Sequence, residues 1–543
     1  MIPDTSISPL DYVSSNNVSS FYAFPASSSE ISSIIKKFDN KGGPLNSIPV
    51  YIYKVLSGLI APILSELFNK SLEFGIFPSC LKVARIVPIF KEGDPHLAEN
   101  YRPISTLSVF SKIFETLMCT RLTKYLYQVG TLSDKQFGFR SKRGTSDAIL
   151  EMYEGVFSAM DSSKYFGVIF LDFSKAFDTV CHRILLSKLN LMGVRGTCLK
   201  WFESYLGERK HFVEIGGHAS YIANLSSSVP QGSVLGPLLF ILYVNDMNNC
   251  CTDANLVHYA DDTTALFCHE NLTSLYEMMN TQLNNIDNWL RANRLSINIS
   301  KTKYMIFSSR QSESQSVVVM RNLKIKRVEV AKFLGTLVDC KLSFKPQIDV
   351  ICSKLSKASG VMYRLRGMVP RNVLLKVYYA IFFPHLCYAI TVWGDSNKNN
   401  YSRILRAHRR AVKNLSDNLN QDFLSPCRLL SYFSVYTYFV LIKMHSLIYD
   451  GEHLGFSCLV DMLRPAHEMS TRFEESMNVN IPKMQKRCGQ RSFIYRAAIC
   501  WNSLPANLKL CAKLNIFKTK LRKHLLETQS VSEYLPSQRD IYH

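Results

Sequence analysis

The sequence lacks the cysteine spacing of a disulfide framework or of a zinc site. Its 15 cysteines are scattered along 543 residues, and Cys250 and Cys251 are adjacent rather than spaced as paired ligands. Disulfide-rich secreted domains are short, and structural zinc sites separate two cysteines by about two to four residues. We therefore expect ordinary reduced cysteines in the core of an intracellular protein.

Long apolar runs are also missing. The most apolar stretch, residues 377–393, contains Pro384 and His385 and is short for a membrane span, so we expect it to form buried helix. The amino terminus is polar and acidic, which excludes a secretory signal. There is no internal repeat, no P-loop and no zinc-protease helix motif. These absences argue against membrane, secreted and P-loop enzyme classes.

Acidic residues are fewer than basic ones. The chain has 64 Lys and Arg residues against 43 Asp and Glu residues, which gives a formal net charge of +21. Such an excess attracts polyanions and makes their binding sensitive to salt. A basic surface alone is commonly only a solvated face, so composition fits a nucleic-acid enzyme without identifying one.

Two adjacent acids, Asp261 and Asp262, follow Tyr259 and Ala260 between two apolar runs at 256–258 and 263–267. Alternating apolar runs around a short polar turn predict a β-hairpin. Such a turn holds carboxylates rigidly at an open edge. Asp is also a common turn former, so this motif needs support from elsewhere in the chain.

That support comes from residues 167–172, a continuously apolar run that ends in Asp172. A buried central strand delivers a charge to the edge of a sheet in this way. Three carboxylates that converge there would repel one another unless divalent cations neutralised them, and oxygen ligands favour Mg²⁺ or Mn²⁺. Two such ions about 3.5–4 Å apart catalyse in-line phosphoryl transfer. The residues alone therefore indicate nucleotidyl transfer.

Seven sequence blocks between about residues 80 and 345 then resemble the reverse transcriptase of a non-LTR retrotransposon, a LINE-type element of the jockey-like kind. The blocks occur in the family's order, and they are 84–91 (ARIVPIFK), 100–105 (NYRPIS), 136–140 (QFGFR), 171–178 (LDFSKAFD), 229–237 (VPQGSVLGP), 259–262 (YADD) and 333–335 (FLG).

The resemblance implies an α+β fold with the right-hand architecture of a polymerase and an antiparallel palm sheet, followed by a mainly helical carboxyl-terminal region. The expected divisions are an N-terminal extension and fingers at 1–164, a palm with the catalytic motifs at 165–310, primer-grip strands and a helical thumb at 311–415, and a region of unknown role at 416–543.

It also implies catalytic roles for particular side chains. Asp172, Asp261 and Asp262 correspond to the metal-binding triad, with two Mg²⁺ or Mn²⁺ ions. Asp261 is the firmer ligand, because successive side chains diverge in a tight turn. Asp262 either holds the residues around the metal ligands or contacts the metals only during turnover. Lys301 occupies the region in which related polymerases place a lysine that protonates the departing pyrophosphate.

Nucleotide-binding roles are implied for a further group. Its members are Lys91, Arg102, Phe173, Phe177, Gln231 and Gly232. Lys91 and Arg102 flank the loop of an expected hairpin and would hold the triphosphate. The backbone carbonyl of Phe173 is a possible further ligand of the metal ions. Gln231 would hydrogen-bond to the sugar or base, and Gly232 would let the backbone approach the nucleotide.

Phe177 corresponds to the aromatic residue that excludes a ribose 2′-OH in reverse transcriptases, so it favours deoxynucleotides. The alternative is that Ala176 and Phe177 are core residues of a short helix after the strand. Phe177 also disfavours a polymerase that copies RNA into RNA, because such enzymes need a small or hydrogen-bonding group there.

Primer and template contacts are implied for two segments. Phe333, Leu334 and Gly335 resemble the support for the primer 3′ end. A second set is a basic stripe at helical spacing whose opposite face is apolar, consisting of Arg403, Arg406, Arg410 and Lys413 opposite Ile404, Ala411, Val412 and Leu415. This stripe is expected to track a template–primer backbone, although a solvated helix face would show the same pattern.

The sequence therefore predicts an RNA-directed DNA polymerase that extends a primer 3′-OH. Its expected partners are an RNA template, a DNA primer or target DNA, and dNTPs, with no membrane. The alternative is a catalytically silent retroelement remnant that only binds nucleic acid. The expected location is intracellular, in a nuclear or cytoplasmic ribonucleoprotein.

Three departures from the family pattern accompany this prediction. No endonuclease domain precedes the polymerase motifs, and no Cys/His zinc knuckle follows them. Residues 41–46 also differ from the Pro-Gly-x-Asp-Gly pattern usual before the fingers. The segments around 491–498 and 501–505 resemble a carboxyl-terminal stretch common in these elements, whose role the sequence leaves open.

Overall fold

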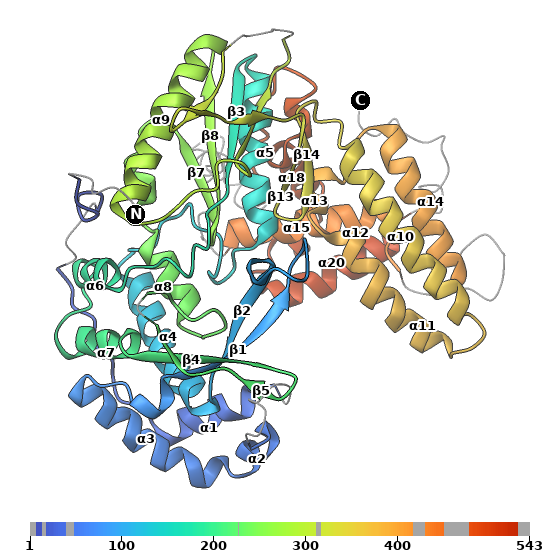
Figure 1. The fold of residues 1–543 in the computed structure, drawn as a ribbon. Coiled ribbons are helices and arrows are strands. Elements are labelled where there is room, and N and C mark those ends of the chain that lie inside the picture. The colour runs from blue at the N-terminus through green and yellow to red at the C-terminus, as the bar shows by residue number, and fades with distance from the viewer. Residues whose placement is uncertain are drawn as a thin grey trace.

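The computed structural model describes residues 7–13, 18–39, 48–225, 227–310, 316–415, 429–449 and 477–529. The fold is a mixture of helices and β-sheets (Figure 1). The divergent segment at 41–46 lies outside the described residues, as do parts of the carboxyl-terminal region.

One sheet is built around a long hairpin near the amino terminus. Its order is β2-β1-β4-β5, and β6 also pairs with β4, with strands β1 (Val83–Phe90), β2 (Tyr101–Thr106), β4 (Arg209–Ile215), β5 (His218–Ala219) and β6 (Ala223–Leu225). β1 and β2 are antiparallel, whereas β1 and β4 are parallel. The hairpin that the sequence predicted between Lys91 and Arg102 is confirmed.

Helices surround this sheet on the amino-terminal side of the molecule. They are α1 (Ser28–Lys37), α2 (Val50–Val55), α3 (Ser57–Phe74), α4 (Val109–Gln128), α6 (His182–Leu191), α7 (Gly196–Leu206) and α8 (Gly236–Tyr243). α4 begins where the Ser108 side chain accepts a hydrogen bond from the Ser111 N–H, a usual N-cap. α8 covers most of the apolar run at 235–244.

The second sheet holds the acidic motifs. Its order is β12-β9-β3-β8-β7, with strands β3 (Tyr165–Leu171), β7 (Asn255–Tyr259), β8 (Asp262–His269), β9 (Lys303–Phe307) and β12 (Lys326–Arg327). β3 lies at the centre, antiparallel to β8 and β9. The prediction of a buried central strand ending at Asp172 is therefore confirmed.

Helices cover both faces of this second sheet. α5 (Thr145–Asp161) and α9 (Leu272–Ala292) lie on opposite sides of β3 (Figure 1). Phe166 contacts Gly155 of α5, whereas the next residue, Gly167, faces Met279 of α9. Because side chains alternate along a strand, β3 contributes to two separate cores, one on each face. A strand that is buried on both faces needs apolar residues at successive positions, as β3 has.

Two short hairpins and a helical array follow the second sheet. The hairpins pair β10 (Val319–Met320) with β11 (Leu323–Lys324), and β13 (Val330–Phe333) with β14 (Thr336–Asp339). The helices after them are α10 (Lys345–Leu365), α11 (Arg371–Val377), α12 (Phe383–Cys387), α13 (Ile390–Trp393), α14 (Lys398–Asn414), α15 (Tyr432–Tyr449), α18 (Phe493–Asn502), α19 (Ala506–Lys509) and α20 (Leu514–Thr528).

The apolar stretch at 377–393 is helical, as expected, although it is divided into successive short helices. A π-helical segment (Tyr378–Phe382) precedes Pro384, and the chain breaks again at Ala389, which has a φ of 52°. Proline has no N–H and its ring collides with the carbonyl four residues earlier, which widens or breaks the preceding turn. Among the described residues, no helix is long and apolar enough to cross a membrane.

The described carboxyl-terminal residues pack on α5 rather than forming a separate body. Asp161 accepts hydrogen bonds from the backbone N–H groups of Gln485 (3.0 Å) and Lys486 (2.7 Å). Glu154 accepts one from the N–H of Phe493 at 2.6 Å, at the start of α18. One apolar core accordingly joins α5, the helices after β14, and the helices from α15 to α20.

Candidate active site

The two adjacent acids lie in the tight turn between β7 and β8. Tyr259 pairs with Asp262, so Ala260 and Asp261 form the tip of the hairpin. Ala260 is buried and has a φ of 57°. A positive φ at the first tip residue suits the right-handed twist of a hairpin, although it strains a residue other than glycine. The predicted hairpin, with its carboxylates held at one edge, is confirmed.

A neighbouring segment fixes this turn in place. The Gln136 Oε1 atom accepts hydrogen bonds from the N–H groups of Gly138 (2.8 Å) and Ala260 (3.1 Å). The N–H of Phe137 donates to the carbonyl of His258 at 2.8 Å. At Gly138 a Cβ atom would lie 2.4 Å from the Ala260 nitrogen, so only glycine fits there without displacement of the backbone.

Asp172 reaches the same edge from β3. The antiparallel register pairs Leu171 with Thr263, so one further step along each strand places Asp172 opposite Asp262. Directly opposite residues of an antiparallel pair have Cβ atoms roughly 5 Å apart. The segment before β9 holds the Asp172 backbone, because its carbonyl accepts a hydrogen bond from the Asn298 N–H at 2.8 Å.

The acids perturb one another electrostatically. Burial, together with the charges of Asp261 and Asp172, raises the pKa of Asp262 to about 6. Burial and Asp172 likewise raise the pKa of Asp261 above its usual value. Lys91 and Arg102 act in the opposite direction on both acids. The β1–β2 hairpin therefore brings both cations within electrostatic reach of the carboxylates. Asp172 is half-buried, and the other four side chains keep contact with solvent.

The donor set suits a hard divalent cation, because it consists of carboxylate oxygens that repel one another. The three carboxylates do not converge closely: among the described residues, no group of three His, Cys, Asp or Glu side chains is placed to hold a metal ion. Like charges are expected to stay apart when no cation lies between them.

The predicted nucleotide-binding residues lie on loops beside the acids. Phe177 is half-buried, and its ring stacks on Phe240 with 4.4 Å between centroids and 24° between planes. The segment around it is a turn rather than the short helix of the alternative, but Ala176 is buried and Phe177 packs against the same core, as that alternative expected. Phe173 is buried, and its backbone pairs with Ile297.

Gln231 and Gly232 lie on a different loop, which precedes α8. The Gln231 Nε2 atom donates to Asp178 Oδ1 at 2.9 Å, which fixes the amide. Gly232 has a φ of 106°, and a Cβ atom there would lie 2.7 Å from the Ser105 carbonyl oxygen. Its close approach in this structure is therefore to the backbone of β2, where the Ser105 N–H donates to the Gln231 carbonyl at 2.7 Å.

Lys301 lies in the turn between α9 and β9. Its N–H donates to the carbonyl of Asn298 at 3.2 Å, the same residue that contacts the Asp172 backbone. The Lys301 side chain is exposed, and within the part of the chain that the structure describes it forms no ion pair with the three acids.

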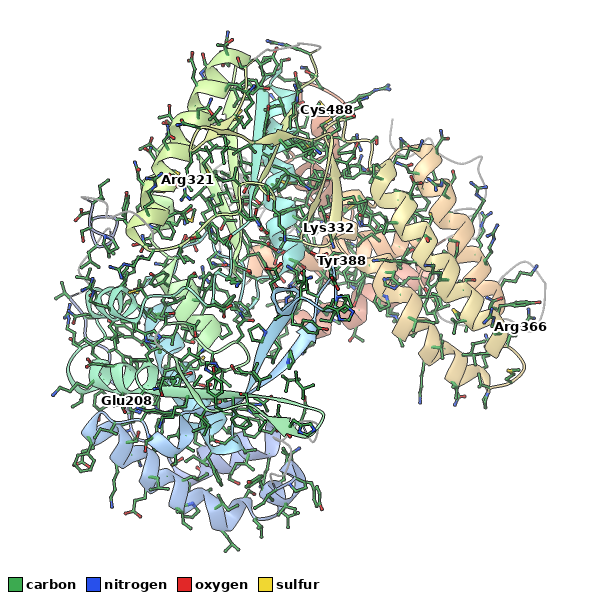
Figure 2. All side chains as sticks on the ribbon, in the orientation of Figure 1. Glu208, Arg321, Lys332, Arg366, Tyr388 and Cys488 are labelled. Atoms are coloured by element: carbon green, nitrogen blue, oxygen red, sulfur yellow. The ribbon has the colours of Figure 1, made fainter. Side chains whose placement is uncertain are left out.

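The 333–335 segment forms the tip of the β13–β14 hairpin. Leu334 and Gly335 both have positive φ, 44° and 82°, as a two-residue turn of this class requires. The Tyr388 hydroxyl donates to the Leu334 carbonyl, which ties the turn to the helices beyond it (Figure 2). Phe333 is buried, with its ring 5.7 Å from that of Phe170, so its side chain belongs to the core rather than to a primer-binding surface.

The basic stripe lies on α14 as the spacing predicted. Arg406, Arg410 and Lys413 are exposed. The opposite face is buried, and it consists of Ile404, Ala411, Val412 and Leu415. Arg403 differs from the others in the stripe because it pairs with Asp349 of α10 at 2.7 Å.

Residues 89–338 match the family described as "Reverse transcriptase (RNA-dependent DNA polymerase)". The matched span begins in β1 and ends in β14, so it contains the three acids and both cations of the hairpin. Residues 89–338 are a reverse transcriptase domain.

The curated relatives that this chain resembles include proteins of Drosophila melanogaster that are named for transposable elements. The chain is 30% identical over 375 residues to a "Probable RNA-directed DNA polymerase from transposon BS", covering 65% of this chain and 40% of that protein. It is 30% identical over 366 residues to the "RNA-directed DNA polymerase from mobile element jockey", with the same coverage. A "Probable RNA-directed DNA polymerase from transposon X-element" is 28% identical over 388 residues. The match covers about two fifths of these relatives' own length.

The reverse transcriptase domain uses three positioning residues that the sequence did not single out. Gln136 holds the catalytic turn, Asn298 holds the backbone of Asp172, and Asp178 orients Gln231. Each lies inside a sequence block that carries the family resemblance or in the stretch before Lys301. Their roles are long-range contacts, which spacing along the chain does not reveal.

Proposed function

We propose that this chain is the RNA-directed DNA polymerase of a non-LTR retrotransposon, and that it extends a primer 3′-OH on an RNA template with dNTPs. One observation carries the proposal: β3 and the β7–β8 turn bring Asp172, Asp261 and Asp262 to one sheet edge, within electrostatic reach of Lys91 and Arg102. This arrangement complements a metal–triphosphate complex, because the carboxylates face the metal cations and the basic hairpin faces the phosphates.

Asp172, Asp261 and Asp262 would hold two divalent ions, Mg²⁺ or Mn²⁺. When bound, such ions activate the attacking hydroxyl and stabilise charge on the leaving group. Lys91 and Arg102 would bind and orient the triphosphate, for which a guanidinium offers a bidentate contact. Lys301 is proposed to hold the proton that the pyrophosphate receives.

The division of the chain into fingers, palm and thumb is part of this proposal. We assign residues 1–164 to an N-terminal extension and fingers, and 165–310 to a palm built on the β3-centred sheet. Residues 311–415 would supply the primer grip and a helical thumb, in which Arg406, Arg410 and Lys413 face the template–primer. The β1–β2 hairpin, which carries the two cations, supports the assignment of the fingers.

Nucleotide selection is assigned to the loop beside Asp172. Phe177 would exclude a ribose 2′-OH, and its stacking on Phe240 supports this role because a supported ring cannot swing away. Gln231, oriented by Asp178, would hydrogen-bond to the incoming nucleotide. Because the product must reach chromosomal DNA, we place the protein in a nuclear or cytoplasmic ribonucleoprotein.

The test is primer extension on an RNA template with purified protein, dNTPs and Mg²⁺ or Mn²⁺. Asp261→Asn should lower the extension rate by about 10³-fold or more, since a metal ligand contributes several kcal/mol to the transition state. The matched control is Asp253→Asn, which removes an exposed carboxylate near the other end of β7 and should leave the rate unchanged.

Mn²⁺ binding, followed by electron paramagnetic resonance, gives a second readout that needs no turnover. We expect binding by the parent chain and weaker binding by Asp261→Asn. A chain that binds template RNA in a salt-sensitive way but neither extends a primer nor binds Mn²⁺ would instead be a catalytically silent nucleic-acid-binding remnant.

A further inference from the structure

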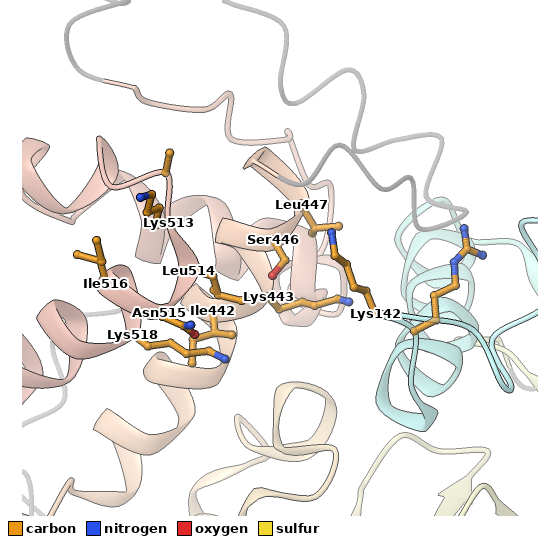
Figure 3. Close-up of a pocket in the computed structure, with 12 residues that line it drawn as sticks. Lys142, Ile442, Lys443, Ser446, Leu447, Lys513, Leu514, Asn515, Ile516 and Lys518 are labelled. Carbon is orange, nitrogen blue, oxygen red and sulfur yellow. The ribbon is translucent and has the colours of Figure 1, made fainter. Parts of the chain in front are cut away.

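A pocket of about 760 Å³ lies between the segment before α5, the end of α15 and the start of α20 (Figure 3). The cations that line it come from all three segments, and they are Lys142, Arg143, Lys443, Lys513 and Lys518. Among the described residues that line the pocket there is no Asp or Glu. This excess of cations over acids in the lining favours an anion there.

Two of these cations fix the walls of the pocket. Lys443 pairs with Asp147 of α5 at 2.5 Å, and this pair joins α15 to the segment that contains Lys142. Arg143 pairs with Asp134 at 2.8 Å. By contrast, Lys513 and Lys518 take part in no ion pair within the described ranges. The walls are therefore held by paired charges, and α20 supplies lysines for a ligand.

Backbone conformation adds a second observation. Lys142 has a φ of 60°, in the left-handed region that residues other than glycine rarely adopt. Such conformations concentrate at sites that bind ligands, where the strain serves to aim a side chain. Figure 3 shows Lys142 on one side of the pocket, with Lys513 and Lys518 on the helix pair opposite.

The rest of the lining is polar and aliphatic. Ser446 and Asn515 offer hydrogen-bonding groups, whereas Leu447, Leu514 and Ile516 provide apolar surface. A volume of about 760 Å³ is within the range of ligand pockets, roughly 300–1,000 Å³. In such a lining the lysines can contact phosphates, and the serine and amide groups can hydrogen-bond to base edges. The aliphatic wall can pack against sugar or base faces.

We propose that this pocket is a second nucleic-acid-binding site, which holds a single-stranded polynucleotide outside the polymerase centre through Lys142, Lys513 and Lys518. The choice of polymer rests on the proposed function, but the binding itself requires no polymerisation. An acidic protein segment would satisfy the lysines, yet it would make less use of the adjoining aliphatic wall and amide. The pocket then gives the carboxyl-terminal helices a role in holding the template away from the reacting end.

The experiment measures equilibrium binding by fluorescence anisotropy, with labelled 20-nucleotide oligouridine and, in a second arm, oligothymidine. The variant combines Lys142→Ala, Lys513→Ala and Lys518→Ala in the full chain. We expect roughly tenfold weaker binding at 0.1 M salt. The slope of log affinity against log salt should fall by about 2, because each lost single-strand phosphate contact removes about 0.7.

Two controls accompany that variant. Lys36→Ala, Lys37→Ala and Lys200→Ala together remove the same charge from exposed positions on α1 and α7, and should leave affinity and slope near the parent values. Replacing the three pocket lysines by arginine should preserve binding, because the charge remains. Circular dichroism verifies that each variant is folded, and the single variant Lys513→Glu repeats the test if the triple variant is not.

Equal binding losses in the pocket variant and in the charge-matched control would overturn the proposal, because only net charge would then matter. Unchanged RNA and DNA binding, together with weakened binding of poly-glutamate, would overturn it in favour of an acidic protein partner. A loss confined to oligouridine or to oligothymidine would identify which polymer occupies the site. These measurements record binding and not polymerisation. Failure of the proposed function would therefore appear in the primer-extension assay and not here.

Discussion

Phe177, five residues after Asp172, is the side chain that we propose selects the sugar of the incoming nucleotide. Phe177→Val should raise incorporation of ribonucleotides relative to deoxynucleotides by roughly tenfold to hundredfold, because the space that excludes a 2′-OH is opened. The stacked Phe240 ring remains in place to keep the surrounding core filled. Competing incorporation of rNTPs and dNTPs on one RNA template measures the ratio.

The matched control for this gate is Phe74→Val, which removes the same atoms from an exposed ring on α3. It should leave the sugar ratio of the parent chain unchanged. If Phe177→Val excludes ribonucleotides as strongly as the parent does, the gate lies elsewhere in the nucleotide site.

At the scale of elements, the catalytic hairpin depends on the segment that packs against its turn. Gly138→Ala should lower the extension rate at least tenfold and cost about 1–3 kcal/mol of stability, because the added methyl group overlaps backbone atoms of the turn. The Ala260 nitrogen is 2.4 Å from the position of that methyl group, and backbone cannot rotate away as a side chain can. Single-turnover extension and chemical denaturation measure the two effects.

Gly58→Ala is the control for that experiment. No atom lies within 4 Å of a Cβ built at Gly58, in the first turn of α3, so the substitution should be neutral or slightly stabilising. Full activity in Gly138→Ala would mean that the turn does not need the 136–138 segment to hold its carboxylates.

At the scale of the whole molecule, a buried acid joins the carboxyl-terminal helices to α5. Burial raises the pKa of Glu154 from 4.5 to about 7, against the opposing effect of the N–H groups of Phe493 and Ile494. The folded state therefore favours the protonated acid. This contribution to stability is complete below about pH 4.5 and is lost as the pH rises through 7.

Glu154→Gln removes that titration and keeps an oxygen for the Phe493 N–H. The free energy of unfolding of the variant minus that of the parent should increase between pH 5 and pH 8.5, by up to about 3 kcal/mol. Thermal or denaturant unfolding across this range measures the difference. Glu73→Gln, at an exposed position on α3, should give a difference that does not vary with pH. A flat profile for Glu154→Gln would show that this carboxyl stays charged.

Much of the local structure was predictable because short-range rules govern it. The apolar run before Asp172 is buried on both faces and forms the central strand, and the Tyr-Ala-Asp-Asp motif forms a hairpin turn. The stripe on α14 alternates buried and exposed residues as helical spacing requires. The helix expected over 377–393 is present but divided, because Pro384 interrupts hydrogen bonding whatever the hydropathy of its neighbours.

The amino-acid sequence by itself determined the chemistry available to this protein: the acids, the cations and the order of the motifs are properties of the chain. Only the tertiary structure decided which of them meet. Strand register placed Asp172 opposite Asp262, Gly232 approached β2, and the carboxyl-terminal helices joined the core of α5 and enclosed a basic pocket. These contacts join residues far apart in sequence, and they depend on packing and register, which local propensity does not encode.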